Sequence, residues 1–247
     1  LGAYSMWFLL KSGNVGYAFA FIITLIILFI IGILIEQTTI KPFFGKPKVE
    51  INIFIATVAL SVVLEQLYLL LFGGRTWDIQ PLYEGVIKLG PFIAKYHEIF
   101  ILIISLLVLF LMWIVLKKTD IGLAIRAVSQ DQLGATLMGI NNRKVYTVTV
   151  GVATLLAGIA GILLGPIYFV DPHMGELPMV KAFAIVILGG LGSIKGTIIA
   201  AFIISLAEVL VGRYIGALWS PIATFSIMIF ILLIKPSGIF GKKVRKA

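Results

Sequence analysis

The sequence contains no cysteine and few charged residues. Only 13% of its 247 residues are charged, compared with about 25% in a typical soluble domain. The lack of cysteine excludes disulfide bonds and thiolate metal sites. The phosphate-binding pattern GxxxxGK[ST] does not occur either, so the sequence offers no P-loop for a nucleotide.

Apolar residues make up 60% of the chain and gather in long uncharged runs. Each run is close to the roughly 20 residues that an α-helix needs to cross a hydrocarbon core about 30 Å thick. The runs are apolar throughout, whereas the strands of a transmembrane barrel alternate apolar and polar residues. The expected fold is therefore an all-α, polytopic transmembrane helix bundle. Its spans are expected in the runs 15–35, 51–72, 99–116, 145–170, 194–212 and 217–234.

Basic residues indicate which side of the membrane each connection faces. The net charge of +9 arises at the ends of the runs and not on one soluble face, so it does not indicate nucleic-acid binding. Lys and Arg gather in segments 36–50, 117–144 and 235–247, which the positive-inside rule assigns to the cytoplasm. Connections 73–97 and 171–180 are then external, and the C-terminus is cytoplasmic. Tryptophan is typical of membrane interfaces, and all four lie near run ends: Trp7, Trp77, Trp113 and Trp219.

The shorter segments give weaker signals. Residues 1–10 are apolar but too few to cross the bilayer. We expect them to be the tail of a span whose beginning is missing, within a single transmembrane domain over 1–247. The connection 73–97 is rich in Gly and Pro and predicts turns, either as a contact surface or as a simple connector. The two histidines, His97 and His173, fall in external connections and are expected to be solvated.

A glycine cluster at 189–193 interrupts the last third of the chain. Residues 177–188 before it would form a helix of about 18 Å, too short for the bilayer. A broken or re-entrant helix must be buried in protein or line a cavity, because its free amides and carbonyls find no water in hydrocarbon. The cluster therefore predicts either a lining of the translocation path or close packing of helices through small residues. Its candidate path residues are Gly189, Gly190, Gly192 and Ser193.

The connection 117–144 carries helix-capping signals. Ser129 and Gln132 have the spacing of a capping box, and Asp131 would lie in the first turn, where a helix favours an anion. These residues predict a short helix over 130–138 outside the membrane.

This short helix is expected to dock on a partner. Isolated helices need about 12–15 residues to be stable in water, and Gly139, a typical C-terminal stop, would end this one earlier. Leu133 and Leu137 lie four residues apart and give an apolar stripe, which Met138 widens. A capped helix with such an edge suits a groove on a partner protein. The alternative is an amphipathic helix that rests on lipid headgroups.

Two carboxylates lie inside apolar runs. Glu65, followed by Gln66, and Glu208 would each cost about 2.5–3.5 kcal/mol as ions at mid-bilayer. Each should therefore face the bundle interior and find a partner or water. All three residues are candidates for the translocation path, with polar contact between helices as the alternative.

Several motifs follow one another in a recognisable order. The sequence reads DIGLAIRA from Asp120 and GIN from Gly139, then MVKAF from Met179, LGGLGSIKG from Leu188, Ala207-Glu208, and KPSGIFG from Lys235. This succession resembles the branched-chain amino-acid ABC transporter permeases of the LivH type over nearly the whole chain. One departure is that members of the family carry a further N-terminal stretch, including most of a first span.

The resemblance implies a permease subunit, not an enzyme, that imports amino acids across the cytoplasmic membrane by alternating access. The cargo would be branched-chain or other hydrophobic amino acids. The implied partners are a homologous second permease, two cytoplasmic ATPase subunits that use ATP and Mg, and an extracytoplasmic substrate-binding protein. The chain itself would bind no cofactor or metal. The residues implied to couple to the ATPases are Asp120, Gly122, Arg126, Ala127, Asp131, Ala135, Leu137, Gly139 and Ile140.

A second class of function stays open on the residues alone. The chain could be a secondary transporter or channel for a small polar solute such as urea or an amide. Glu65 and Glu208 would then be proton or cation sites, and the broken helix would be the binding site. The capped helix over 130–138 distinguishes the two classes, because a secondary transporter does not need a docking helix.

Overall fold

The computed structural model describes residues 1–12, 16–44, 49–80, 85–89, 92–190, 192–235 and 237–241. The chain forms two compact units, Leu1–Met174 and Gly175–Ala247, which are described one after the other. The single domain expected over 1–247 stays a prediction. Lys46, Lys48 and the basic residues of 242–247, which were used to predict orientation, lie outside the described residues.

Helices dominate both units. The elements of the first unit are α1 (Gly2–Ser12), α2 (Tyr17–Ile35), the π-helical turn η1 (Glu36–Ile40), the 3-10 turn η2 (Lys41–Phe43), α3 (Val49–Phe72), β1 (Val86–Leu89), β2 (Phe92–Lys95), α4 (Tyr96–Lys118), α5 (Asp120–Gln130), α6 (Gln132–Leu137) and α7 (Asn142–Tyr168). Those of the second unit are α8 (Glu176–Gly189), α9 (Ile194–Tyr214), the 3-10 turn η3 (Ala217–Trp219) and α10 (Ser220–Ile234).

Six helices of the described part are long and apolar enough to cross a membrane. Many of their large apolar side chains are exposed, as expected of helices that face lipid. The predicted all-α, multi-pass membrane fold is confirmed. The six candidate spans are Tyr17–Phe43, Ile51–Phe72, Tyr96–Lys118, Asn142–Tyr168, Ile194–Tyr214 and Ala217–Ile234.

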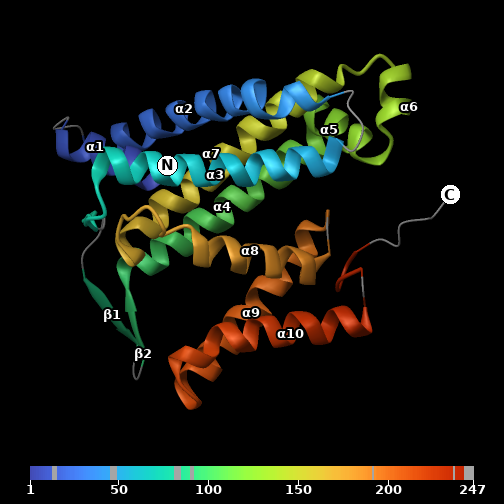
Figure 1. The fold of residues 1–247 in the computed structure, drawn as a ribbon. Coiled ribbons are helices and arrows are strands. Elements are labelled where there is room, and N and C mark those ends of the chain that lie inside the picture. The colour runs from blue at the N-terminus through green and yellow to red at the C-terminus, as the bar shows by residue number, and fades with distance from the viewer. Residues whose placement is uncertain are drawn as a thin grey trace. The chain divides into compact units, whose positions relative to one another are not determined.

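Close packing of α2 on α7 forms the centre of the first unit (Figure 1). A Cβ at Gly32 of α2 would lie 2.7 Å from Oγ1 of Thr154, and a Cβ at Gly158 of α7 would overlap Leu28. α1 packs on α7 at the same level, where Gly2 meets the backbone of Gly158. Such contacts are typical of membrane helices, because small residues let backbones approach closely.

The segment between α3 and α4, in which the sequence predicted only turns, contains an antiparallel β-hairpin. β1 pairs with β2 in a register that places Val86 opposite Lys95, and Figure 1 shows the hairpin at the start of α4. The prediction missed these strands because two strands of four residues show too little alternation to be recognised.

His97 lies in the first turn of α4 and is not solvated. Its side chain is buried, and its Nε2 lies 3.3 Å from the carbonyl oxygen of Leu163 in α7. The predicted solvated position is therefore wrong for this residue. No local pattern could indicate the contact, because α4 and α7 are distant along the chain.

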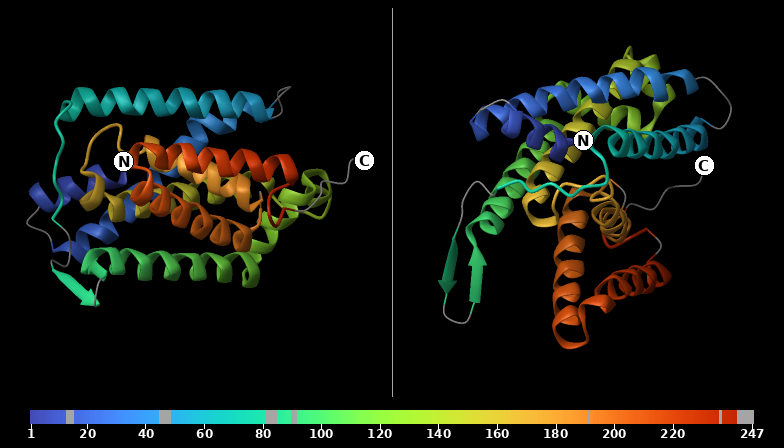
Figure 2. Two further views of the ribbon diagram at one scale, coloured as in Figure 1. Left: turned by 90° about the horizontal axis from the view of Figure 1, so that it is seen from below. Right: turned by 60° about the vertical axis from the view of Figure 1, so that its left-hand side comes forward.

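The second unit consists of three helices joined by tight turns. α8 and α9 form a hairpin, and α10 folds back along α9 after η3 (Figure 2). The 14 residues of α8 span about 21 Å, which is less than the hydrocarbon core of about 30 Å. The predicted break at the glycine cluster is confirmed, since one helix ends at Gly189 and the next begins at Ile194.

Candidate functional site

The connection between α4 and α7 contains two helices where the sequence predicted one. The first of them, α5, begins at Asp120, and the hydroxyl of Thr119 accepts a hydrogen bond from the Gly122 amide at 3.1 Å. Gly122 has no room for a side chain, because a Cβ there would overlap the backbone of Leu116 at the end of α4. The Arg126 guanidinium donates to the carbonyl oxygen of Leu116. These contacts fix α5 against α4.

Asp131, and not Ser129, caps the second helix, α6. The Asp131 carboxylate accepts hydrogen bonds from two amides of the first turn, each at 3.0 Å, whereas the Ser129 hydroxyl donates back to a carbonyl of α5. The predicted capping box is therefore wrong, and the helix expected over 130–138 is Gln132–Leu137. Asp131 is the better cap because its carboxylate accepts both bonds and carries the charge that a helix N-terminus favours.

Gly139 ends α6 in the left-handed conformation, as the sequence predicted. Its φ is +83°, and its amide donates to the carbonyl of Thr136 at 3.0 Å. The next amide, that of Ile140, donates to the carbonyl of Ala135 at 3.0 Å. This pair of bonds is a Schellman motif, which satisfies carbonyls that a helix end otherwise leaves free.

The inner face of α6 packs on its neighbours. Ala135 forms a small core with Val128 of α5 and Val145 of α7, and Ala127 and Ile140 pack against it. Because three helices share this core, the connection is a folded element and not a loose tether.

The outer face of α6 is the predicted apolar edge. Leu133, Leu137 and Met138 are 72%, 78% and 84% exposed. Asp120 and Asp131, at the starts of the two helices, are also exposed. Among the residues implied to couple to an ATPase, Leu137 is thus a large apolar side chain that is free to enter a partner. The coupling role of the whole set stays a prediction.

Replacing Gly139 with valine is expected to weaken the docking on ATPase subunits that the resemblance implies, and to reduce uptake. A Cβ at Gly139 would meet no atom within 4 Å, so the cost is conformational, about 1–3 kcal/mol for a side chain held in the left-handed region. Co-purification of the ATPases with the tagged chain measures the effect. Gly139→Asn should retain most binding, because Asn tolerates this region. Equal losses in both variants would contradict the explanation.

The carboxylate of Glu65 in α3 contacts the ring of His173. The two side chains approach to 2.7 Å between Oε1 and Nδ1, and both are partly exposed. The prediction that Glu65 finds a partner is met, and His173 is exposed to solvent, as expected, while it contacts Glu65. Gln66, the next residue of α3, is exposed. Participation of Glu65 and Gln66 in a translocation path stays a prediction.

Glu65→Gln is expected to keep uptake within about threefold of wild type. The amide oxygen of Gln can accept the hydrogen bond from a neutral His173 ring, and a single bond of this kind contributes about 1 kcal/mol. Uptake of labelled substrate measures the effect, with Glu65→Leu as the variant that removes the acceptor. Loss of uptake in Glu65→Gln with normal assembly would instead indicate proton coupling at this carboxylate.

Glu208 of α9 has a partner that the sequence did not indicate. Lys181 of α8 lies 2.9 Å away, from Nζ to Oε2. The hydroxyl of Thr224 in α10 donates to the other carboxylate oxygen, Oε1, at 2.6 Å. An isolated charge here would cost about 2.5–3.5 kcal/mol, and the pair reduces that cost. Lys181 is itself a charge within an otherwise apolar stretch, and that signal alone could have identified it.

The glycine cluster lies where backbones meet. A Cβ at Gly189 would lie 2.5 Å from the carbonyl carbon of Gly196, and Gly190 and Gly192 have φ values of +97° and +83°. Ser193 caps α9 by accepting from the Gly196 amide at 3.1 Å. This geometry is that of the close-packing interpretation. The role of the cluster in a translocation path stays a prediction.

The segment after α10 also packs on this turn. The amides of Ile239 and Phe240 donate to the carbonyls of Leu188 and Gly189 at 2.8 and 3.1 Å. A Cβ at Gly238 would lie 2.6 Å from the amide nitrogen of Gly190. The motif KPSGIFG therefore closes the end of α8 within the second unit.

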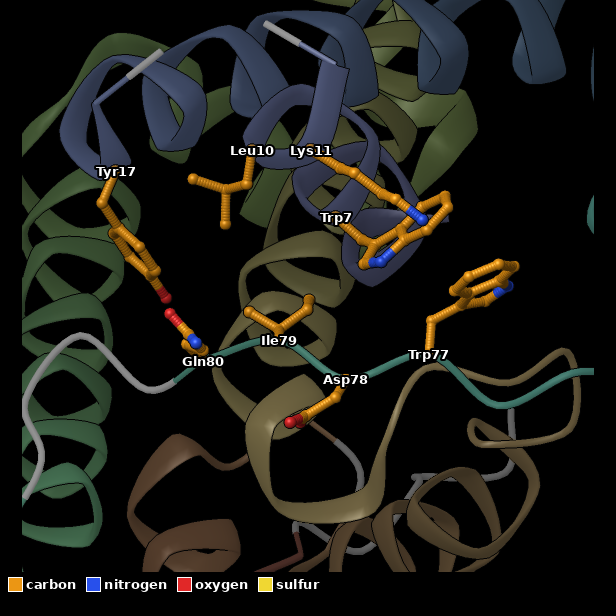
Figure 3. A pocket seen from close by; sticks show the side chains of 8 residues that line it. All are labelled: Trp7, Leu10, Lys11, Tyr17, Trp77, Asp78, Ile79 and Gln80. Atoms are coloured by element: carbon orange, nitrogen blue, oxygen red, sulfur yellow. The ribbon is translucent and has the colours of Figure 1, made fainter. Parts of the chain in front are cut away.

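A cavity of about 630 Å³ lies in the first unit between the end of α1, the start of α2 and an extended segment that follows α3 (Figure 3). Lys11 lies over two indole rings, with Nζ 4.8 Å from the centre of Trp7 and 4.4 Å from that of Trp77. Tyr17 and Gln80 point toward one another at the other end of the cavity. A lysine over tryptophan rings is a cation–π arrangement, and its position near span ends is typical of an interfacial anchor.

Glu36 is a buried carboxylate that the sequence reasoning missed. It is 1% exposed at the start of η1, and its Oε2 accepts a hydrogen bond from Thr147 Oγ1 of α7 at 2.9 Å. It lines a cavity of about 330 Å³ together with Lys41, Arg143 and Lys144. Because Glu36 directly follows an apolar run and precedes basic residues, it resembled an ordinary solvated span end.

Comparison with known proteins decides the family. A family model described as "Branched-chain amino acid transport system / permease component" matches residues 1–235. The chain belongs to this permease family. It is therefore a transport subunit and a multi-pass membrane protein, and the alternative of a self-sufficient secondary transporter or channel is not favoured.

Several curated relatives cover most of the chain. The permease LivH of Salmonella typhimurium is 29% identical over 248 residues, which cover 98% of this chain and 78% of the relative. The permease BraD of Pseudomonas aeruginosa is 28% identical over 229 residues, 90% of this chain and 74% of the relative. A probable LivH of Methanocaldococcus jannaschii is 29% identical over 243 residues, 91% and 76% of the two chains. No solved structure matches the chain.

Proposed function

We propose that this chain is a permease subunit of an ATP-driven amino-acid importer, with branched-chain or other hydrophobic amino acids as cargo. The carrying observation is the folded connection between α4 and α7, which presents Leu137 on an exposed apolar edge in a chain that lacks a P-loop. The high-affinity LivH and BraD relatives are named as permeases for branched-chain amino acids, which supports this cargo.

The connection is built to pass force in both directions along the chain. Toward α4, α5 is held by Arg126 and by the close approach of Gly122. Toward α7, the Asn142 side chain donates from Nδ2 to the Gln132 carbonyl at 3.1 Å and to the Thr136 hydroxyl at 2.8 Å. A displacement of α6 by a moving ATPase would therefore reach two membrane helices. Such coupling requires a rigid element whose position depends both on the ATPase and on the membrane helices.

The proposed complex divides the work among several chains. Two cytoplasmic ATPase subunits would bind ATP and Mg and dock on α6. A homologous second permease would complete the path through the bilayer, and an extracytoplasmic binding protein would deliver the amino acid. This chain would supply the path and the coupling surface and would bind no cofactor.

Reconstitution tests the proposed function directly. The chain would be purified with its second permease and ATPases, placed in proteoliposomes, and supplied with the binding protein loaded with labelled leucine. We expect uptake that needs both ATP and the binding protein. Uptake of leucine that is independent of ATP would refute the proposal, as would an assembled complex with active ATPases that imports neither leucine nor any other branched-chain or hydrophobic amino acid.

Topology gives a separate prediction. Lys46, Ser129 and Lys243 are predicted on the cytoplasmic side, and Glu84 and His173 on the external side; Lys46, Lys243 and Glu84 lie outside the described residues. In this cysteine-free chain, single cysteines at Ser129 and at Arg75, which follows α3, test the two faces. We expect Ser129→Cys to react with impermeant maleimide only after cell lysis and Arg75→Cys to react in intact spheroplasts. The reverse labelling would invert the topology.

A further inference from the structure

The helices of the second unit enclose a small polar network. The ammonium of Lys181 lies 2.9 Å from Glu208 Oε2, and the hydroxyl of Thr224 donates to Oε1 at 2.6 Å. Ser220 Oγ donates to the backbone carbonyl of Glu208 at 3.0 Å. Three helices thus contribute to this network, and each oxygen of the carboxylate has its own donor.

Packing of the three helices does not require these charges. Ala184, Leu188, Ala200 and Ile204 form a buried apolar core of α8 and α9, against which Ile227, Met228 and Ile231 of α10 pack. The backbones of α8 and α9 also meet at the glycine turn. An ion pair in such surroundings commonly stabilises less than apolar side chains of the same volume. Charges kept inside a membrane segment therefore indicate a role in binding or transport.

The position of the pair suits a site that receives substrate. Lys181 lies in the second turn of α8 and Glu208 near the end of α9, so both are within about two helical turns of the end opposite the glycine turn. In the predicted orientation this is the external end. The two side chains are 35% and 16% exposed, so the pair is mostly buried but still accessible from the surface.

We infer that Lys181 and Glu208 form a binding site for the zwitterionic head of an α-amino acid, an inference that rests on the proposed function. The substrate carboxylate would bind the Lys181 ammonium, and the substrate ammonium would bind the Glu208 carboxylate. Both interactions are charge-assisted hydrogen bonds, which are stronger than neutral ones. A free amino acid carries one positive and one negative charge, and the site offers a partner for each in Glu208 and Lys181.

When the substrate replaces the contact between Lys181 and Glu208, every charge keeps a partner of opposite sign. Lys181 has a long flexible side chain that can swing away from Glu208 as the zwitterion enters between them. Thr224 continues to hold Glu208 Oε1 and acts as a positioning residue for the carboxylate. When the substrate leaves, the ion pair closes again, so the site is neutral overall in both states and avoids the cost of an isolated charge in the membrane.

The test replaces both charges together with apolar side chains. The double variant Lys181→Met with Glu208→Leu is expected to assemble with its partners and to melt at the wild-type temperature, because apolar packing replaces the pair. Leucine uptake by the reconstituted complex should fall on the order of 100-fold, about tenfold for each charge-assisted bond to the substrate that the variant cannot form. Lys195→Met is the matched control, since Lys195 is an exposed lysine at the other end of α9, and it should transport normally.

Each outcome of this experiment decides the inference. Wild-type uptake by the double variant would show that transport does not need the pair, and failure of the variant to assemble would show that the pair serves structure; either result would overturn the binding site. The variant Lys181→Arg with Glu208→Asp keeps both charges and should transport better than the apolar variant. If the wild-type complex imports no amino acid, the proposed function fails; if wild type and double variant import equally, only the inferred site fails.

Discussion

Leu137→Asp is expected to abolish both leucine uptake and co-purification of the ATPase subunits, while insertion of the chain in the membrane stays normal. Leu137 is 78% exposed on the outer face of α6, so the change leaves the small core beneath the helix intact. In the complex, loss of a buried apolar anchor commonly weakens binding by about 2 kcal/mol or more, about 30-fold. The new carboxylate would in addition be buried without a partner.

Gln132→Asp is the matched control for this experiment. It adds the same charge to the same helix, but at the exposed first position, where the helix N-terminus favours an anion. ATPase binding and uptake should stay near wild type in this variant. Normal binding and transport in Leu137→Asp would remove the main support for α6 as a docking element.

Gly189→Ala is expected to prevent α8 and α9 of the second unit from packing together at the glycine turn. The added methyl group would lie 2.5 Å from the carbonyl carbon of Gly196 and equally close to the Thr197 amide nitrogen. These are backbone atoms, which cannot rotate aside as the end of a side chain can. Overpacking of this kind costs about 3 kcal/mol, and we expect a lower melting temperature in detergent, a low yield of folded chain, and loss of uptake.

Gly175→Ala makes the same change at the other end of α8. Gly175 has φ −82° and precedes the first residue of the helix, and a Cβ there would meet no atom within 4 Å. The melting temperature should therefore change little. Similar destabilisation by both substitutions would show that α8 tolerates no alanine at its ends, and the close contact of Gly189 with Gly196 would lose its significance.

The sequence predicted the membrane helices well because their signal is local and large. A run of about 20 apolar residues has few other solutions in a bilayer, and the break at 189–193 followed from the same length argument. Elements with smaller signals were missed. The two short strands of the hairpin lacked a recognisable period, whereas α5 has local signals, the Thr119 cap and apolar residues at Ile121, Ile125 and Val128, that the prediction overlooked.

Residues of the candidate site were predictable where the local sequence alone indicates their role. The exposed edge at Leu137 and the left-handed Gly139 follow from spacing and from the properties of glycine. The cap was misplaced because Ser129 and Asp131 are both good caps, and only the geometry shows which one reaches the free amides. The partners of Glu65 and Glu208 were not predictable, since each lies on another segment and no local pattern links them.

The hydrogen bonds from Ile239 and Phe240 to the end of α8 also set an order for biogenesis. The carbonyls of Leu188 and Gly189 receive these donors only after α9 and α10 have been synthesised and inserted. Until then, the base of the α8–α9 hairpin has free carbonyls that water or the insertion machinery must satisfy, because hydrocarbon offers no donors. The α8–α9 hairpin therefore leaves the ribosome before these two hydrogen bonds can form. A nascent chain interrupted before residue 237 would expose this defect to the proteases that survey the membrane.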